Sequence, residues 1–87
     1  MFLGSNNWGG LMARVYILAN VLPGKDREIR EALRATKGVA MADVVTGHYD
    51  IVAVLEAESM SMIFDNILKK VRGIKGINRT ETFVAVE

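Results

Sequence analysis

The chain of 87 residues is long enough for one small domain and carries no cysteine, which excludes a disulfide framework, a thiolate zinc site and a thiol nucleophile. Eleven Lys and Arg oppose ten Asp and Glu, and the resulting net charge of +1 gives no strong attraction to nucleic acid or to an anionic membrane. The longest uncharged run, residues 1–13, is too short to span a bilayer. We therefore expect an ordered cytoplasmic domain without direct nucleic-acid or membrane contacts.

The first eleven residues, MFLGSNNWGGL, hold no charge and lack the positive start and continuous apolar stretch of a secretory signal. We expect residues 1–11 to be a flexible arm or the result of an upstream start, with Met12 as the true beginning. Residues 12–87 are then the domain.

The first half of that domain reads as strand, helix and strand. Residues 14–21 (RVYILANV) are rich in β-branched and aromatic side chains and are predicted as a strand. After a Pro-Gly pair, a helix is predicted from Lys25 or Asp26 to about Lys37, with an apolar stripe at Ile29, Ala32 and Leu33. A glycine ends it, and residues 39–46 (VAMADVVT) are predicted as the second strand.

The second half repeats this order after a turn at residues 47–50. Residues 51–57 are predicted as a strand that forms an antiparallel hairpin with the preceding one. Ser59 occupies an N-cap position. The helix after it has an apolar stripe at Met60, Ile63, Phe64, Ile67, Leu68 and Val71. Residues 77–86 (INRTETFVAV) are the predicted fourth strand.

The order of strand, helix, strand, strand, helix, strand predicts an α+β fold of the ferredoxin-like βαββαβ type. It consists of a four-stranded antiparallel sheet with two helices on one face. The first and third strands are the most continuously apolar, so we expect them in the centre of the sheet, with the second and fourth at its edges.

The strands are apolar on both of their faces, although the helices cover only one. In the first strand, Ile17 and Ala19 oppose Tyr16 and Leu18, and the second and third strands show the same pattern. A domain of this length holds no third layer, so we expect a second copy to cover the open face and form a dimer.

The sequence offers no convincing catalytic or metal-binding set, and we expect a protein that is not an enzyme and needs no metal or cofactor. His48 and Asp50 share a turn, but two ligands without further partners are a weak metal signal. Basic residues at the end of the second helix are interpreted as complementing the helix dipole, with a nucleic-acid surface as the less favoured alternative: Lys69, Lys70, Arg72 and Lys75.

The turn Thr46-Gly47-His48-Tyr49-Asp50 has two interpretations. In the simpler one, Gly47 supplies a positive φ and Asp50 accepts hydrogen bonds from nearby backbone N–H groups. In the other, Tyr49 and Asp50 line a small polar pocket at the rim of an oligomer, where a carboxylate accepts from an ammonium group and backbone N–H groups hold a carboxylate. An α-amino acid presents both groups.

The stretches VTGHYDIVAVLEA and INRTETFVAV, with the helix between them, resemble the C-terminal effector domain of the Lrp/AsnC family, also called the RAM domain. The most specific parts are the Gly-x-Tyr-Asp turn at residues 47–50 and the Arg-Thr-x-Thr run at residues 79–82. The resemblance implies a βαββαβ fold, dimers with sheets packed face to face, often an octameric ring, and an amino-acid effector bound between dimers. It implies a pocket lined by Gly47, Tyr49 and Asp50, in which His48 tunes the choice of ligand side chain. Thr80 and Thr82 on the edge strand are weaker candidates.

Full regulators of this family place a helix-turn-helix domain ahead of the effector domain, and only eleven residues precede Met12 here. The resemblance therefore implies a stand-alone module that binds a small amino acid. We expect it to assemble by itself or together with a full-length Lrp/AsnC regulator, and to influence transcription indirectly through that partner.

Three alternatives remain. A small dimeric α+β-barrel enzyme shares the topology and would use Tyr16, Asn20 and His48. A pure assembly domain would have no ligand, and the turn would be only a turn. An ACT-type amino-acid module is a related possibility with nearly the same function.

Overall fold

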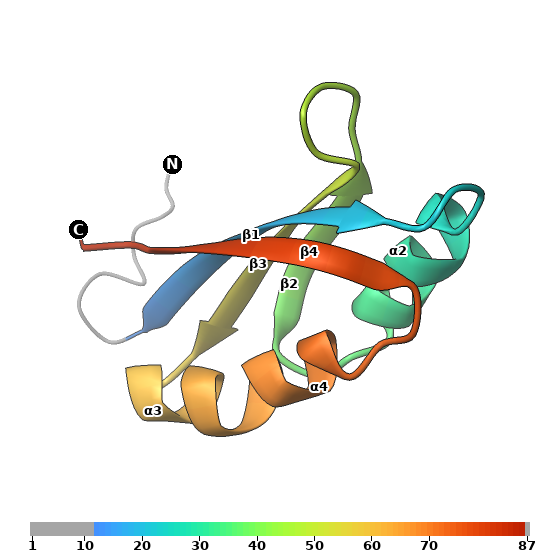
Figure 1. The fold of residues 1–87 in the computed structure, drawn as a ribbon. Helices are drawn as coiled ribbons and strands as arrows, with labels where there is room; N and C mark the ends of the chain where they lie inside the picture. The colour runs from blue at the N-terminus through green and yellow to red at the C-terminus, as the bar shows by residue number, and fades with distance from the viewer. Residues whose placement is uncertain (1–11, 87) are drawn as a thin grey trace.

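The computed structural model describes residues 12–86, and within them four strands form one antiparallel sheet (Figure 1). The strands are β1 (Ala13–Val21), β2 (Val39–Val44), β3 (Ile51–Ala57) and β4 (Ile77–Val84). Their order in the sheet is β2-β3-β1-β4, so the first and third strands are central, as predicted. The proposed arm at residues 1–11 lies outside the described residues.

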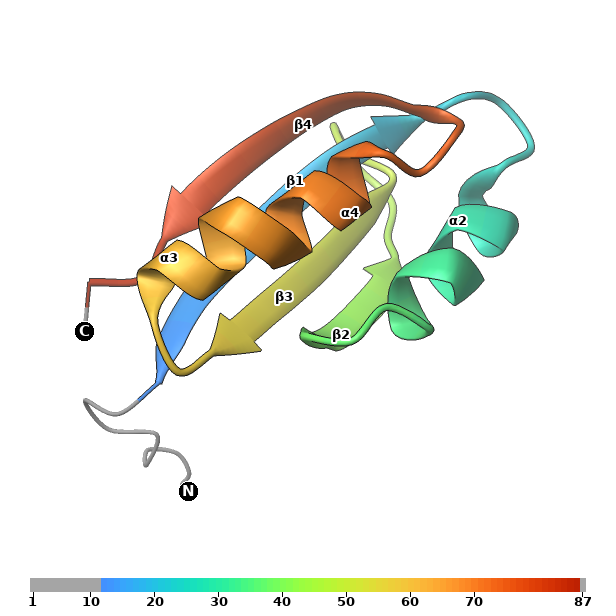
Figure 2. The same cartoon turned by 90° about the horizontal axis from the view of Figure 1, so that it is seen from below.

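Both helical segments cover the same face of the sheet, which Figure 2 shows from the helical side. The first is α2 (Asp26–Arg34), and the second runs through α3 (Met60–Met62), η1 (Ile63–Ile67) and α4 (Leu68–Arg72). The predicted ferredoxin-like class is thereby confirmed. The first helix ends three residues earlier than predicted, because the chain turns at Thr36, whose N–H donates to the carbonyl of Leu33 at 2.9 Å.

The hydrophobic core lies between the sheet and the helices. Alternate residues of β1 and β3 point into it, in the period of two that a strand dictates. The largest fully buried side chains come from both layers: Ile17, Ile29, Leu33, Ile51, Leu55, Ile63, Val15 and Val71. No polar or charged residue among those described is buried, so the core is wholly apolar.

The second helical segment contains a π-turn that the sequence did not reveal. Ser59 caps it as predicted, accepting a hydrogen bond from the Met62 N–H at 3.2 Å. Over η1 the chain takes a wider turn, and the Leu68 N–H donates to the Ile63 carbonyl, five residues back. The wider turn changes the directions in which the side chains of residues 63–67 leave the helix axis. As a result Phe64, predicted in the stripe, is 38% exposed.

Two glycines allow the helices to approach the sheet closely. Gly38 and Gly76 each precede an edge strand, with φ of 99° and 102°. A Cβ on Gly38 would lie 2.7 Å from Cγ1 of Ile67, and one on Gly76 would lie 2.9 Å from Cδ1 of Ile29. The glycine that follows each helix therefore packs under an isoleucine of the other helix. Any larger residue there would strain the backbone and displace that isoleucine.

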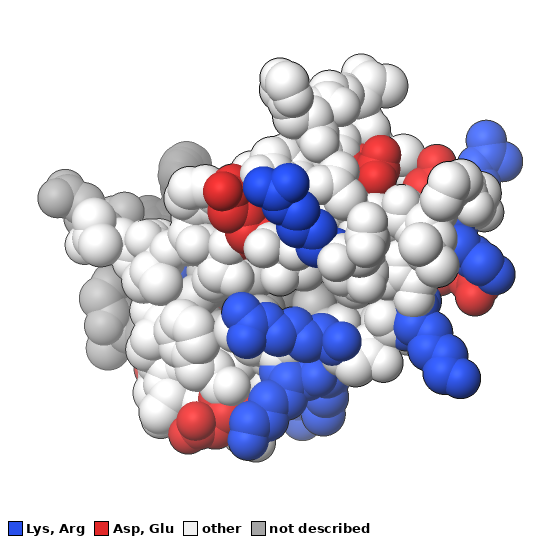
Figure 3. Space-filling model, in the orientation of Figure 1, with Lys and Arg blue, Asp and Glu red and all other residues white. Residues whose placement is uncertain are grey.

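Charges are distributed differently over the two helical segments. Figure 3 shows Lys and Arg side chains gathered on the part of the surface where α4 lies. Lys69, Lys70 and Arg72 occupy the last turn of α4, where cations favour the helix dipole, and none of them forms an ion pair with a described residue. Lys75 is also exposed and lies beyond the helix.

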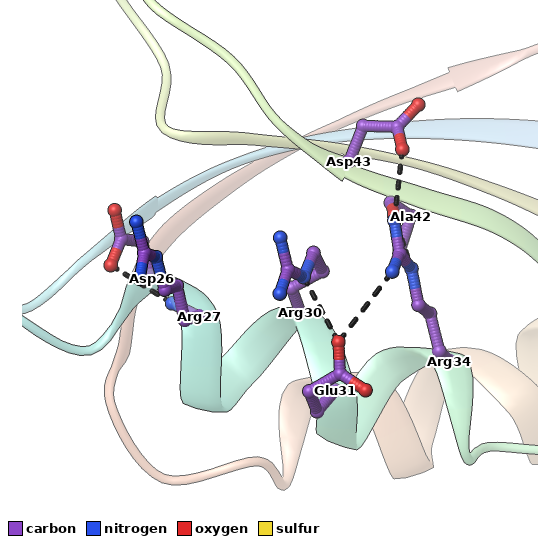
Figure 4. Close-up of polar contacts among 7 residues, drawn as sticks. All are labelled: Asp26, Arg27, Arg30, Glu31, Arg34, Ala42 and Asp43. Carbon is purple, nitrogen blue, oxygen red and sulfur yellow. Dashed lines mark hydrogen bonds and ion pairs between the residues drawn. The ribbon is translucent and has the colours of Figure 1, made fainter.

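On α2 the charges are instead linked in a chain that reaches the sheet (Figure 4). Glu31 pairs with Arg30 at 3.0 Å and with Arg34 at 3.5 Å. The side chain of Arg34 also contacts the edge strand β2. It donates to the carbonyl of Ala42 at 2.9 Å and to the carboxylate of Asp43 at 3.1 Å. This contact occupies part of the outer edge of β2, which would otherwise offer backbone groups to another strand.

Candidate functional site

The face of the sheet opposite the helices carries an apolar band across all four strands. The register pairs Tyr16 with Val54 and Leu18 with Val52, and residues paired across an antiparallel ladder share a face. At the two edges the band continues into Met41, 42% exposed, and Phe83, 49% exposed. The prediction of two-sided apolar strands is therefore confirmed, and no described element covers this face.

An ion pair lies at one end of the open face. Arg14 Nε lies 3.1 Å from Glu56 Oε2, and both side chains are about three-quarters buried. The same guanidinium donates to the Tyr16 hydroxyl at 2.8 Å and lies 5.7 Å from the centre of the Tyr16 ring. These contacts keep the charges paired beside the apolar band. A second layer could then cover this end without leaving a buried charge unpaired.

At the other end of the face lies the predicted turn between β2 and β3. Asp50 ties this turn to β1: its Oδ2 accepts from the Val21 N–H at 2.9 Å and its own N–H donates to the Ala19 carbonyl at 2.9 Å. The Val21 N–H lies at a register shift between β1 and β4, where the ladder is interrupted. The Asp50 carboxylate thus satisfies a backbone donor that the sheet leaves unpaired.

The tip of the turn is held by contacts to both central and edge strands. The Asn20 side-chain amide donates to the carbonyl of His48 at 2.9 Å, and Gly47 has a φ of 141°. The Tyr49 hydroxyl donates to Oε1 of Glu81 on β4 at 2.7 Å. This hydrogen bond to a carboxylate raises the pKa of Tyr49 above its usual value, because ionising the phenol would break the bond and place two negative charges together.

The six predicted site residues do not all face the same way. The structure brings Gly47, His48, Tyr49 and Asp50 together in one turn at the rim of the open face. Thr80 and Thr82 pair with Ala19 and Ile17, which are buried under the helices, so both threonines belong to the helix side of β4.

Sequence reasoning missed two residues on the opposite side of the same strand. Glu81 pairs with Leu18 and Arg79 with Asn20, so both belong to the open face. The alternation of side chains along β4 could have identified them. Because successive residues of a strand point to opposite faces, Arg79 and Glu81 lie on the face opposite Thr80 and Thr82.

The residues of the enzyme alternative are only partly brought together. Asn20 contacts His48 at the turn, but through the backbone carbonyl and not the imidazole. Tyr16 lies four residues back along β1, about 13 Å away at the usual rise of a strand, where it contacts Arg14. These three side chains form no common constellation.

Other candidate sites lie elsewhere or are absent from the described part of the chain. A shallow depression of about 240 Å³ is lined by Met12, Gly38, Val39, Ala40 and Glu56, at the end of β3 away from the turn. Within residues 12–86, no group of three His, Cys, Asp or Glu is placed to hold a metal ion. No helix in that range has the length and apolar character needed to cross a membrane.

Comparisons with known proteins agree with this architecture. The family model described as the Lrp/AsnC ligand binding domain matches residues 14–87. The crystal structure of FFRP-DM1 superposes with a TM-score of 0.79 and 32% identity, covering 85% of this chain and 99% of that one. The crystal structure of a hypothetical protein, PHS023, from Pyrococcus horikoshii superposes with a TM-score of 0.80 and 32% identity, covering 86% of this chain and 90% of that one. Escherichia coli AsnC, at 20% identity and a TM-score of 0.81, shares the fold over 100% of this chain and 59% of its own. No curated protein sequence matches the chain.

Proposed function

The chain belongs to the Lrp/AsnC ligand-binding domain family, and from that premise we propose that it is a non-catalytic effector module that binds a small amino acid and assembles through its open sheet face. In this proposal it acts in the cytoplasm, alone or with a full-length Lrp/AsnC-type regulator, and affects transcription only through that partner. The assembly is a dimer that associates further into a ring such as an octamer.

The observation that carries the proposal is the juxtaposition of the open apolar face with the anchored turn at its rim. Tyr16, Leu18 and Val54 form the centre of a surface that a second copy of the sheet would cover. The turn at residues 47–50 stands at the end of that surface, where neighbouring copies would complete a pocket. Backbone N–H groups of a turn suit a carboxylate, and side-chain carboxylates suit an ammonium group.

We propose Gly47, His48, Tyr49 and Asp50 as the principal ligand contacts. Thr80 and Thr82 remain the weaker candidates, and their place on the helix side of β4 supports that lower rank. His48 has no side-chain hydrogen bond to a described residue, so its imidazole is available to select among ligand side chains. Asp50 contributes the oxygen that does not bind Val21.

Calorimetric titration with each of the twenty standard amino acids tests this proposal. We expect one or a few of them to bind, and Asp50→Asn to weaken binding about tenfold or more, the effect of losing one charge-assisted hydrogen bond. Asparagine keeps an oxygen for the Val21 N–H, so the turn remains anchored. Glu58→Gln, an equal loss of charge at an exposed position beyond β3, is the control. Binding by none of the amino acids would refute the proposal.

One observation favours a second candidate function, that of a pure assembly domain. The Asp50 carboxylate accepts the Val21 N–H where the ladder between β1 and β4 is interrupted. This structural role explains the presence of Asp50 without any ligand. A domain of this kind would form the same oligomer and show no heat of binding with any amino acid.

A further inference from the structure

Two oppositely charged side chains stand next to each other on the open face of β4, beside the turn. Arg79 and Glu81 are two residues apart on one strand, so their side chains leave the same face about 7 Å apart. Both residues are exposed. Neither was among the residues that the sequence assigned to the site.

Neither charge is neutralised by an ion pair within the described residues. No described residue forms an ion pair with Arg79 or with Glu81. Glu81 instead accepts the Tyr49 hydroxyl at Oε1, and the positive charge of Arg79 is close enough to act on that phenol. The hydrogen bond fixes one carboxylate oxygen of Glu81 and leaves Oε2 without a described partner. The guanidinium of Arg79 likewise donates to no residue among those described.

This arrangement matches the two charges of an α-amino acid. The ammonium and carboxylate groups of a zwitterion are attached to the same short backbone, and a hydrogen bond of about 2.8 Å at each end extends its reach. An anion and a cation about 7 Å apart on flexible stems can therefore bind both ends at once. Guanidinium also binds carboxylate in the bidentate geometry that a single ammonium group cannot provide.

We propose that Glu81 binds the ammonium group and Arg79 the carboxylate of the amino acid, with Tyr49 as a positioning residue that orients Glu81. This inference rests on the proposed function and names the groups that read the ligand backbone. An ammonium group has three donors, so Glu81 can bind it together with the oxygen of Asp50 that does not hold the Val21 N–H. Gly47 and His48 then contact the rest of the ligand.

The test is calorimetric titration of Glu81→Gln and Arg79→Gln with whichever of the twenty amino acids binds the unaltered protein most tightly. Glutamine at residue 81 keeps an oxygen for the Tyr49 hydroxyl, so the turn keeps its support. We expect each variant to bind about tenfold or more weakly. Glu58→Gln and Lys75→Gln make the same charge changes at exposed positions outside the site and should leave binding within twofold.

A second titration, with the carboxamide of the same amino acid, separates ligand contact from a structural role. The amide keeps the ammonium and loses the carboxylate charge, so Glu81→Gln should weaken it further, whereas Arg79→Gln should change its affinity by less than twofold. Unchanged amino-acid affinity in both variants would overturn this inference and leave the proposed function standing. Equal losses for acid and amide in both variants would show a structural role and overturn it as well. If no amino acid binds the unaltered protein, the proposed function fails first.

Discussion

At the scale of single residues, the structure separates positions that only fix the backbone from positions that are available for chemistry. Ser59 and Gly47 were recognisable in the sequence, because an N-cap and a tight turn each strongly favour particular residue types. The hydrogen bond between Tyr49 and Glu81 was not, since it joins residues that are 32 positions apart and depends on which way β4 faces. Long-range pairs of this kind carry no local pattern.

Replacing Gly38 by alanine tests the close approach of the helices to the sheet. A side chain at its φ of 99° is strained, and the new Cβ would collide with Ile67, so we expect a loss of about 2 to 5 kcal/mol in the free energy of unfolding. Gly24→Ala is the matched control: it has a φ of 81° and nothing within 4 Å of a Cβ, so about 1 to 2 kcal/mol is expected. Urea denaturation measures both. Equal losses would contradict the proposed contact.

The Tyr49 hydroxyl gives a pH signature. Its pKa is raised in the folded protein, so the stabilising effect of its hydrogen bond is fully present below the pKa of an unfolded tyrosine, near 10, and is lost as pH rises through the higher folded value. Phenolate absorbance in a Tyr16→Phe background should show Tyr49 ionising at a higher pH than an unperturbed tyrosine. Glu81→Ala, which removes both the hydrogen-bond acceptor and its charge, should move the pKa of Tyr49 downward. A pKa of Tyr49 that is unaffected by Glu81→Ala would argue against the hydrogen bond.

At the scale of the elements, local pattern predicted the order and type of every helix and strand in the described residues, but not the detailed course of the second helical segment. A π-turn adds one residue to a helical turn without changing composition, so periodicity placed Phe64 on the buried stripe with Ile63. The strand β2 is also shorter than predicted. Val45 and Thr46 continue its apolar and β-branched run in the sequence, but its last ladder pair is at Val44.

Replacing Ile63 and Phe64 by alanine, one at a time, tests which side chains of the second helical segment face the core. Ile63 is 0% exposed, and Ile63→Ala should cost about 2 to 5 kcal/mol in the free energy of unfolding, whereas Phe64→Ala should cost less than half as much because its ring is 38% exposed. Chemical denaturation of the two variants under identical conditions gives the comparison. A larger loss for Phe64→Ala would contradict the π-turn and indicate a regular α-helix.

At the scale of the whole molecule, the open sheet face is the feature that links the fold to the proposed function. The sequence predicted it correctly, since apolar residues at both phases of β1 and β3 can be read without any knowledge of long-range contacts. No described element covers this face, and no pattern within one chain encodes the geometry with which a second chain would cover it. At the outer edge of β2, Arg34 binds the carbonyl of Ala42, so this backbone group is not available to pair with another strand.

Native mass spectrometry of the purified chain, with and without a mixture of the twenty standard amino acids, tests the central claim most directly. We predict an even-numbered oligomer that gains the mass of one amino acid per binding site, and that falls to monomers when Leu18 on the open face is replaced by glutamate. Met62→Glu, at an exposed position on α3, should leave the oligomer intact. A monomer at all concentrations would contradict the account of the sheet face, and an intact oligomer with no bound amino acid would contradict the proposed effector function.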